Sequence, residues 1–572
     1  MKDIFKRFSC IWLCLVILAG AYLGYLRFQP LKAEKVDESP MLLSEAGDSA
    51  SFKLMLSDLK QLSSEVHSVD TEGIYKVHNF IKDRLNTLGY KYTEEPYALT
   101  IDEILRLREK WMDYRSRENL DDEQSIRDYS GIGDKPTLNI NNISVFIDSP
   151  NSDDIIVFMA HTDSVKEGPG TFDDTIAVAC MLESLRLLKD TTPKRDMLFL
   201  FTDGEEQGLL GAFKYVEDNK DILKNIKMII NLEARGNHGA MLMFETSENN
   251  LQMVKTLNDA LNRPVSTSIA TGVYRTMQND TDLTVFFMEN CPGMNFACID
   301  NPKVYHTAQD NYDTFSRDTA TQYLNDITDM ALYFANADSL NFESNQDAVF
   351  FPLFGKKLII LPQNIANIIS WAIGILSFVF MLYCIINKKA SLIKILISFA
   401  LSLLCMVITY FISLGLINLV HNIGNFKYEI GKSLIDSDWI TPLGLIMFIV
   451  FSILNFIFIG KFANKKITDL EKALGVIMLP SLLCIVLPFV FPSASYLFTI
   501  ITFFTLLVIV VSRFNKPIGF IFYLIAAFMI MLVIAPITYL VYTALTIYNL
   551  HLALVFFLIS ILSLGALKGV LK

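Results

Sequence analysis

The stretch "MLFLFTDGEEQGLLGAFKYVEDN" (residues 197–219) contains an apolar run, a polar turn and a helical pattern in direct succession. Short apolar runs rich in aromatic or β-branched residues, such as 197–202, are typical of buried strands. Similar runs lie at 143–148, 155–160, 228–233 and 294–299, and helical patterns at 174–190, 209–219 and 249–262 separate most of them. This alternation predicts an α/β domain with a mostly parallel mixed central sheet and flanking helices.

Polar residues that could carry chemistry follow these runs directly, or lie in the loops between them and the next helix. In parallel sheets, active sites form at the carboxyl ends of the strands. Taken singly, an acid or histidine at such a place is more often a helix cap or a solvated turn residue. Together they are two histidines and several carboxylates without a thiolate, a set that suits zinc or a neighbouring metal. The candidates are His161, Asp163, Asp173, Glu205, Glu206, Glu233 and His306.

The motifs around these candidates resemble one known family over about residues 55–340. "AHTDSV", "GPGTFDD", "DGEEQGLLGA", "NLEARG" and "YHTAQDN" are similar in order and spacing to the signature of the co-catalytic zinc exopeptidases. That family includes secreted bacterial aminopeptidases and glutamate carboxypeptidases. "NLEARG" followed by "LMFETS", with an apolar C-terminal region, most resembles the membrane-anchored vacuolar and endoplasmic-reticulum metallopeptidases. The resemblance implies the zinc-exopeptidase fold and a peptidase activity, with aminopeptidase favoured over carboxypeptidase.

The same resemblance implies two Zn2+ ions per chain and assigns a role to each candidate. His161, Asp173 and Glu233 would hold one zinc, and Glu206 and His306 the other, with Asp173 bridging the two. Glu205 would be the general base that takes a proton from water. Glu233 is a departure, because the secreted aminopeptidases carry aspartate at this place.

Asp163 and three further residues have supporting or open roles. Asp163 would accept the second ring N–H of His161, and Asp310 would do the same for His306. Tyr305 resembles the tyrosine that polarises the substrate carbonyl, although a packing role is a close alternative. Arg235 is either an anchor for a substrate carboxylate or a structural partner of the acid cluster.

The chain of 572 residues is 52% hydrophobic, and the excess lies at its ends. Lysines and arginines fall after alternate runs of membrane-spanning length, which predicts cytoplasmic termini and an extracytoplasmic position for residues 30–355. We therefore expect an integral, multi-pass protein whose catalytic domain faces the cell exterior or, in a eukaryote, a lumen. The eight predicted spans are 10–26, 366–387, 395–419, 440–460, 473–491, 495–511, 518–543 and 549–567.

The expected domain order follows from these spans. Residues 1–29 form a cytoplasmic N-terminus and transmembrane anchor, and 30–345 the extracytoplasmic zinc peptidase domain, with 92–135 as an insertion or flap. Residues 346–365 form a linker, and 366–572 a membrane domain of seven helices. Cys291 and Cys298 could form a disulfide in an oxidising compartment, a question that the sequence leaves open.

The expected partners are a peptide substrate and membrane lipid, with a homodimer as an open alternative. No nucleic acid is expected, because the net charge is -11 and no basic stripe is present. Two other functions stay open: a glutaminyl-cyclase-like enzyme with a single zinc, and a catalytically silent receptor-like domain. Tyr305 argues against the cyclase, because that branch of the family is similar in motif but has tryptophan before the last histidine. The intact set of candidate ligands argues against the second.

Overall fold

The computed structural model describes residues 2–33, 35–115, 122–277, 279–424, 440–461, 467–545 and 550–571. The chain divides into two compact units. Pro30–Asp347 form one, which we call the sheet unit, while Met1–Gln29 and the chain from Ala348 onward make up most of the other, the helical unit. Two predictions fall partly on undescribed residues: the 92–135 insertion at 116–121 and the start of the last span at 549.

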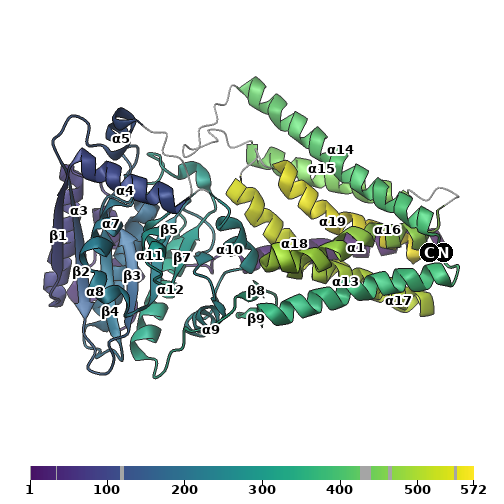
Figure 1. Cartoon of the computed structure of the whole chain (residues 1–572), viewed down its shortest axis with the longest axis horizontal. Helices are drawn as coiled ribbons and strands as arrows, with labels where there is room; N and C mark the ends of the chain where they lie inside the picture. The colour runs from purple at the N-terminus through teal and green to yellow at the C-terminus, as the bar shows by residue number, and fades with distance from the viewer. Residues whose placement is uncertain are drawn as a thin grey trace. The chain divides into compact units, whose positions relative to one another are not determined.

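A seven-stranded sheet in the order β1-β2-β4-β3-β5-β7-β6 is the centre of the sheet unit (Figure 1). The inner strands β4, β3, β5 and β7 are parallel to one another, whereas β1, β2 and β6 run antiparallel to their neighbours. The predicted mixed, mostly parallel sheet is therefore confirmed. The strands are β1 (Thr93–Leu99), β2 (Leu138–Ile147), β3 (Ile155–His161), β4 (Asp196–Thr202), β5 (Ile226–Ala234), β6 (Leu242–Thr246) and β7 (Gly293–Cys298).

Helices cover both faces of this sheet (Figure 1). Every residue of β3 and β4 is therefore buried. On one face Phe158 and Phe199 stack at 5.2 Å, and Phe334 of α12 packs edge-on against Phe158. On the other, Met159 belongs to a core cluster with Phe213 of α7. The helices of this unit are α2 (Phe52–Leu62), α3 (Glu72–Leu88), α4 (Ile101–Tyr114), α5 (Glu123–Ser130), α6 (Ile176–Leu188), α7 (Leu210–Asp218), α8 (Lys220–Leu223), α9 (Leu251–Ala260), α10 (Ser268–Tyr274), α11 (Asp282–Met288) and α12 (Arg317–Asn336), with short helical turns at Leu43–Glu45, Thr171–Thr175 and Pro302–Val304.

The predicted insertion or flap at 92–135 is wrong for its first part. β1 pairs with β2 along its whole length, from Thr93 opposite Ser144 to Leu99 opposite Leu138. Ile104 and Leu107 of α4 lie in the same core cluster as the inner strands. β1 is an edge strand with a mostly exposed, charged outer face. Such a strand has no continuous apolar run, and the apolar pattern of the sequence therefore did not predict it.

The two cysteines considered for a disulfide lie near opposite ends of β7, and both are free thiols. Seven residues of extended chain separate their Cα atoms by roughly 20 Å, whereas a disulfide needs about 4.4–6.8 Å. The structure therefore excludes this pairing.

The helical unit contains a β-hairpin within the interval expected as a linker, followed by a series of apolar helices. Among the residues that the structure describes, six helices of this unit are long and apolar enough to cross a membrane, which marks the chain as a membrane protein by length and composition. The other two predicted spans fall on α1 and α15, whose described apolar parts, Ile11–Arg27 and Leu443–Ile459, are shorter. The elements are α1 (Lys2–Arg27), β8 (Ala348–Pro352), β9 (Leu358–Pro362), α13 (Gln363–Ile386), α14 (Leu392–Gly424), α15 (Ile440–Lys461), α16 (Asp469–Val490), the turn Pro492–Ala494, α17 (Ser495–Phe514), α18 (Lys516–Leu545) and α19 (Leu550–Val570).

Close backbone approach holds α1 against α18. A Cβ atom at Gly20 would lie 2.6 Å from the carbonyl oxygen of Phe528, and one at Gly24 would lie 2.3 Å from that of Leu532. Glycines four residues apart present a flat face on which a second apolar helix can pack closely. The N-terminal helix is therefore an integral part of the helical unit.

One buried carboxyl on α12 makes the stability of the sheet unit depend on pH. Burial raises the pKa of Asp326 to about 7, while Gln322 donates a 2.9 Å hydrogen bond to it. Because the folded-state pKa lies above the unfolded value, this stability contribution is complete below about pH 4 and is lost as pH rises through 7. Between pH 5 and pH 8 the free energy of unfolding of the wild type should fall by about 2–3 kcal/mol more than that of Asp326→Asn.

Calorimetric unfolding of the detergent-solubilised chain across this pH range measures that difference. Asp259→Asn, which alters an exposed carboxylate on α9, is the matched control and should follow the wild type. Parallel pH curves for the wild type and Asp326→Asn would contradict the prediction.

Candidate metal centre

The carboxyl ends of the inner parallel strands bring the predicted ligands together. His161 is the last residue of β3, Glu233 lies near the end of β5, and the loops after β4 and β7 carry the glutamate pair and His306. Three overlapping groups have ligand atoms within 4.8 Å of one another: His161 with Asp173 and Glu233, His161 with Glu205 and Glu206, and Asp173 with Glu206 and His306. All five predicted metal ligands and the predicted base are therefore neighbours.

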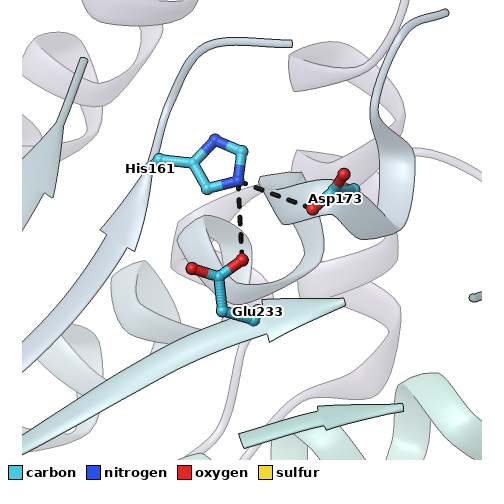
Figure 2. A group of neighbouring side chains, drawn as sticks. All are labelled: His161, Asp173 and Glu233. Carbon is cyan, nitrogen blue, oxygen red and sulfur yellow. Dashed lines mark ion pairs between the residues drawn. The ribbon is translucent and has the colours of Figure 1, made fainter. Parts of the chain in front are cut away.

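The first group surrounds Nε2 of His161, as Figure 2 shows. This nitrogen lies 3.5 Å from Oδ1 of Asp173 and 3.9 Å from Oε2 of Glu233, and all three residues are buried. On the other side of the ring, Nδ1 lies 2.9 Å from the main-chain carbonyl oxygen of Asp163. A carbonyl only accepts hydrogen bonds, so Nδ1 carries a proton, and Nε2 is the ring atom that is left to bind a metal.

The second group surrounds Nε2 of His306, which lies 3.0 Å from Oε2 of Glu206 and 3.3 Å from Oδ2 of Asp173. Asp173 thus turns one oxygen to each histidine and stands between the two groups. His306 itself has a left-handed backbone with φ of 56°. Such a conformation is strained for a residue other than glycine and is common at functional sites.

Asp163 was expected to accept the ring N–H of His161 with its carboxylate, and this expectation is wrong in detail. Its backbone carbonyl accepts that proton, while its carboxylate, 3.6 Å from Nδ1, accepts the main-chain N–H groups of Gly204, Glu205 and Glu206 at 2.8–3.2 Å. Gly204, with φ of 79°, makes the turn that aims these groups at one carboxylate. Asp163 therefore fixes the loop that carries the glutamate pair.

Asp310 was expected to orient His306, but it holds the backbone of another ligand instead. Its buried carboxylate accepts the N–H of Phe172 at 3.0 and 3.2 Å and the N–H of Asp173 at 3.1 Å. Both aspartates follow a candidate ligand histidine in sequence, and both fix a loop from elsewhere in the chain. We call the two side chains the aspartate clamps.

Tyr305 and Arg235 lie beside the ligand groups. The ring of Tyr305 stacks on the imidazole of His306 with a centroid distance of 3.7 Å. The backbone N–H of Arg235 donates to the carbonyl of Cys298, which places Arg235 where β5 and β7 end. In the described part of the chain, the guanidinium of Arg235 makes no ion pair with the acid cluster. Of the two roles left open for Arg235, the structural one is therefore not observed.

The electrostatics of the cluster point to a cation. Burial, and after it the neighbouring Glu233 carboxylate, raise the pKa of Glu205 well above its usual range. Burial likewise raises the pKa values of Glu206 and Glu233. These directions reflect the free-energy cost of several negative charges that share one buried space.

The donor set of the cluster fits a divalent metal. The Nε2 atoms of His161 and His306 are buried and form no hydrogen bond with any residue that the structure describes. Carboxylates accept hydrogen bonds but donate none, so the facing atoms around His161 are all acceptors. A cation between such atoms removes their mutual repulsion, and imidazole with carboxylate is the ligand set of zinc sites.

Three polar residues near the site were not predicted from the sequence. Asn231, buried in β5, donates at 3.1 Å to Oε1 of Glu233. Asp282, at the start of α11, accepts from the hydroxyl of Thr202 at 2.5 Å, and its other oxygen has no partner among the described residues. Burial and then the charge of Glu205 raise the pKa of Tyr129 on α5 to about 12. Asn231 carried a signal, a polar residue inside an apolar strand, whereas Asp282 and Tyr129 resembled ordinary cap and loop residues.

The clamp at Asp310 predicts a measurable loss of metal affinity. In Asp310→Asn the charge that fixes the Phe172–Asp173 backbone is removed, and zinc affinity should fall about 10- to 100-fold. Competition with a chromophoric chelator measures this affinity. Asp313→Asn, an exposed carboxylate three residues further on, is the control. Equal affinity in Asp310→Asn and the wild type would show that the clamp does not position the ligands.

Comparison with known proteins supports this description of the sheet unit. Residues 142–331 match the model of Peptidase family M28. Endoplasmic reticulum metallopeptidase 1 of Mus musculus is 29% identical over 244 residues, 41% of this chain and 27% of that protein. The vacuolar membrane protease of Yarrowia lipolytica is 30% identical over 259 residues, 44% of this chain and 26% of that protein.

Solved structures also align with about half of the chain. An aminopeptidase from Aneurinibacillus sp. strain AM-1 is 16% identical, covers 51% of this chain and 96% of its own, and has a TM-score of 0.41. The matched segments are about a quarter of each curated relative's length. The family match includes the strands β3, β4, β5 and β7 and every predicted metal ligand. Residues 142–331 therefore form a peptidase family M28 domain.

Proposed function

We propose that the protein is a membrane-anchored zinc metallopeptidase that hydrolyses peptide bonds as an aminopeptidase-type exopeptidase. The observation that carries the proposal is the convergence of two histidines and four carboxylates at one sheet edge, with Asp173 between the two ligand groups. The M28 match and the relatives named metallopeptidase or protease support the same class.

Two zinc ions would occupy the cluster. His161, Asp173 and Glu233 would hold one, and Glu206, His306 and the second oxygen of Asp173 the other. When bound, such a pair lowers the pKa of water and polarises the peptide carbonyl.

Glu205 is the proposed general base. It neighbours both ligand groups, and the Asp163 clamp fixes its main-chain N–H at 3.1 Å. The pKa of Glu205 is raised toward neutral pH. A base whose pKa lies near the operating pH both accepts and releases a proton efficiently. Glu205 would take a proton from the attacking water and deliver it to the leaving amine.

Tyr305 is the proposed donor to the substrate carbonyl. Burial, followed by the nearby carboxylates, raises the pKa of its phenol, which keeps the O–H protonated. Stacking on His306 restricts the ring to one side of the ligand cluster. A fixed hydroxyl can donate to the oxygen that gains negative charge in the transition state.

The distribution of positive charge suggests which side of the membrane the domain faces. Lys388, Lys389 and Lys394 lie between α13 and the first turns of α14, and Arg513 and Lys516 lie where α17 passes into α18. If every predicted span crosses, these residues are on one side, and the positive-inside rule makes that side cytoplasmic. The sheet unit would then be extracytoplasmic.

Glu205→Gln tests the proposed activity in detergent-solubilised protein. Peptides with free and acetylated N-termini are compared with and without a chelator. The wild type should cleave the free-amine peptides only, and the chelator should abolish cleavage. Glu205→Gln should lower kcat at least about 100-fold while zinc content stays unchanged, because the predicted base is not a predicted ligand.

Glu248→Gln, an exposed glutamate after β6, is the matched control and should keep wild-type kcat. Cleavage by Glu205→Gln at the wild-type rate would refute the role of the base. Zinc binding without cleavage of any peptide would refute peptidase activity and favour the cyclase or the silent receptor-like alternative.

A further inference from the structure

Arg235 lies on the same sheet face as a predicted metal ligand. It follows Glu233 by two residues, and its backbone N–H continues the β5–β7 ladder with a 3.0 Å hydrogen bond to Cys298. In extended chain, residues two apart point to the same face. Glu233 points toward His161 (Figure 2). Arg235 therefore lies beside the ligand cluster, two residues further toward the carboxyl edge of the sheet.

Arg235 is half-buried, and its guanidinium makes no hydrogen bond or ion pair with any residue that the structure describes. Other arginines of the sheet unit are engaged. Arg84 pairs with Asp58, and Arg317 pairs with Glu38 at 2.7 Å. Arg275, which follows α10, donates to the carbonyls of Thr246 and Ser247. Arg235 thus keeps its planar set of donors available.

Its neighbours indicate where the charge lies. The backbone N–H of Arg235 is bonded to Cys298, the last residue of β7, and the loop after β7 carries Tyr305, whose ring stacks on His306. Arg235 therefore lies at the strand ends that carry the ligand groups and the proposed carbonyl donor, where a peptide bond would be cleaved. The carboxylates of the cluster are the predicted metal ligands and base, which leaves this cation for an anion that arrives with the substrate.

We propose that Arg235 binds a carboxylate of the substrate next to the scissile bond, and that the enzyme prefers short peptides with such a group. The inference rests on the proposed peptidase function and names its substrate class. Guanidinium and carboxylate match as a pair of parallel hydrogen bonds, which is why arginine recognises this group well. The carboxylate could be the C-terminal one of a dipeptide or the side chain of an acidic residue after the cleaved bond.

Three peptides separate these sources in zinc-loaded, detergent-solubilised full-length protein. Leu-Ala has a free C-terminal carboxylate, Leu-Ala-amide has none, and Leu-Glu-amide has only a side-chain carboxylate. Released leucine is quantified by chromatography to give kcat and KM for each peptide. The wild type should cleave one or both carboxylate peptides with a kcat/KM about 10- to 100-fold above that of Leu-Ala-amide.

Arg235→Gln should lower the ratio of kcat/KM for the carboxylate peptides to kcat/KM for Leu-Ala-amide to about one, and Arg235→Lys should retain part of this preference. Inhibition of Leu-Ala-amide cleavage by N-acetylalanine, compared with inhibition by its amide, gives a readout in which the carboxylate compound is not itself cleaved. The wild type should be inhibited more strongly by the acid, and Arg235→Gln equally by both. Arg275→Gln is the matched control and should keep the preference, and the zinc content and melting temperature of each variant confirm folding.

Two outcomes would overturn the inference alone. The first is a wild type that cleaves Leu-Ala, Leu-Glu-amide and Leu-Ala-amide equally well. The second is an Arg235→Gln variant that loses the same factor for all three peptides, which would indicate a role in the reaction itself. Failure of the wild type to cleave any of them would instead contradict the proposed function, and the inference with it.

Discussion

Hydrogen bonds from main-chain N–H groups to two buried aspartates hold the candidate metal centre together. Asp163 accepts from residues 204–206, and Asp310 accepts from Phe172 and Asp173. Each aspartate is placed by the strand end or turn that also carries a histidine, and each fixes a loop from a different crossover. The distances between ligands therefore depend on two charge-assisted links rather than on loop rigidity. Such bonds are stronger than neutral ones, and their acceptors are shielded from water here.

The clamps also explain how so many carboxylates can share one buried space. Burial raises the pKa values of Glu205, Glu206 and Glu233, so the free chain pays a free-energy cost to keep them charged. A divalent cation offsets that cost, and the clamps keep the carboxylates close together before it binds. Arg235 lies outside the ligand set, and its guanidinium has no partner among the described residues. In our proposal a substrate carboxylate balances this positive charge.

Much of the fold and most of the site could be predicted from the sequence because both depend on local patterns. Apolar runs marked the inner strands, and the polar residues after them marked the edge where His161, Glu206 and Glu233 meet. What the sequence could not supply were links between distant residues, such as the bonds from Asp163 to the 204–206 loop and from Asp310 to Asp173. β1 was missed because its outer face is charged, and Asp282 because an acid at a helix start has an ordinary reading as a cap.

The number of zinc ions bound per chain is the measurement that tests the account most directly. Mass spectrometry of the metal in purified, zinc-loaded full-length protein should find two ions per chain. His306→Ala should reduce the count to one, because the group of Asp173, Glu206 and His306 loses its only imidazole while the His161 group stays intact. A single zinc in the wild type, or an unchanged count in His306→Ala, would contradict a two-metal centre bridged by Asp173.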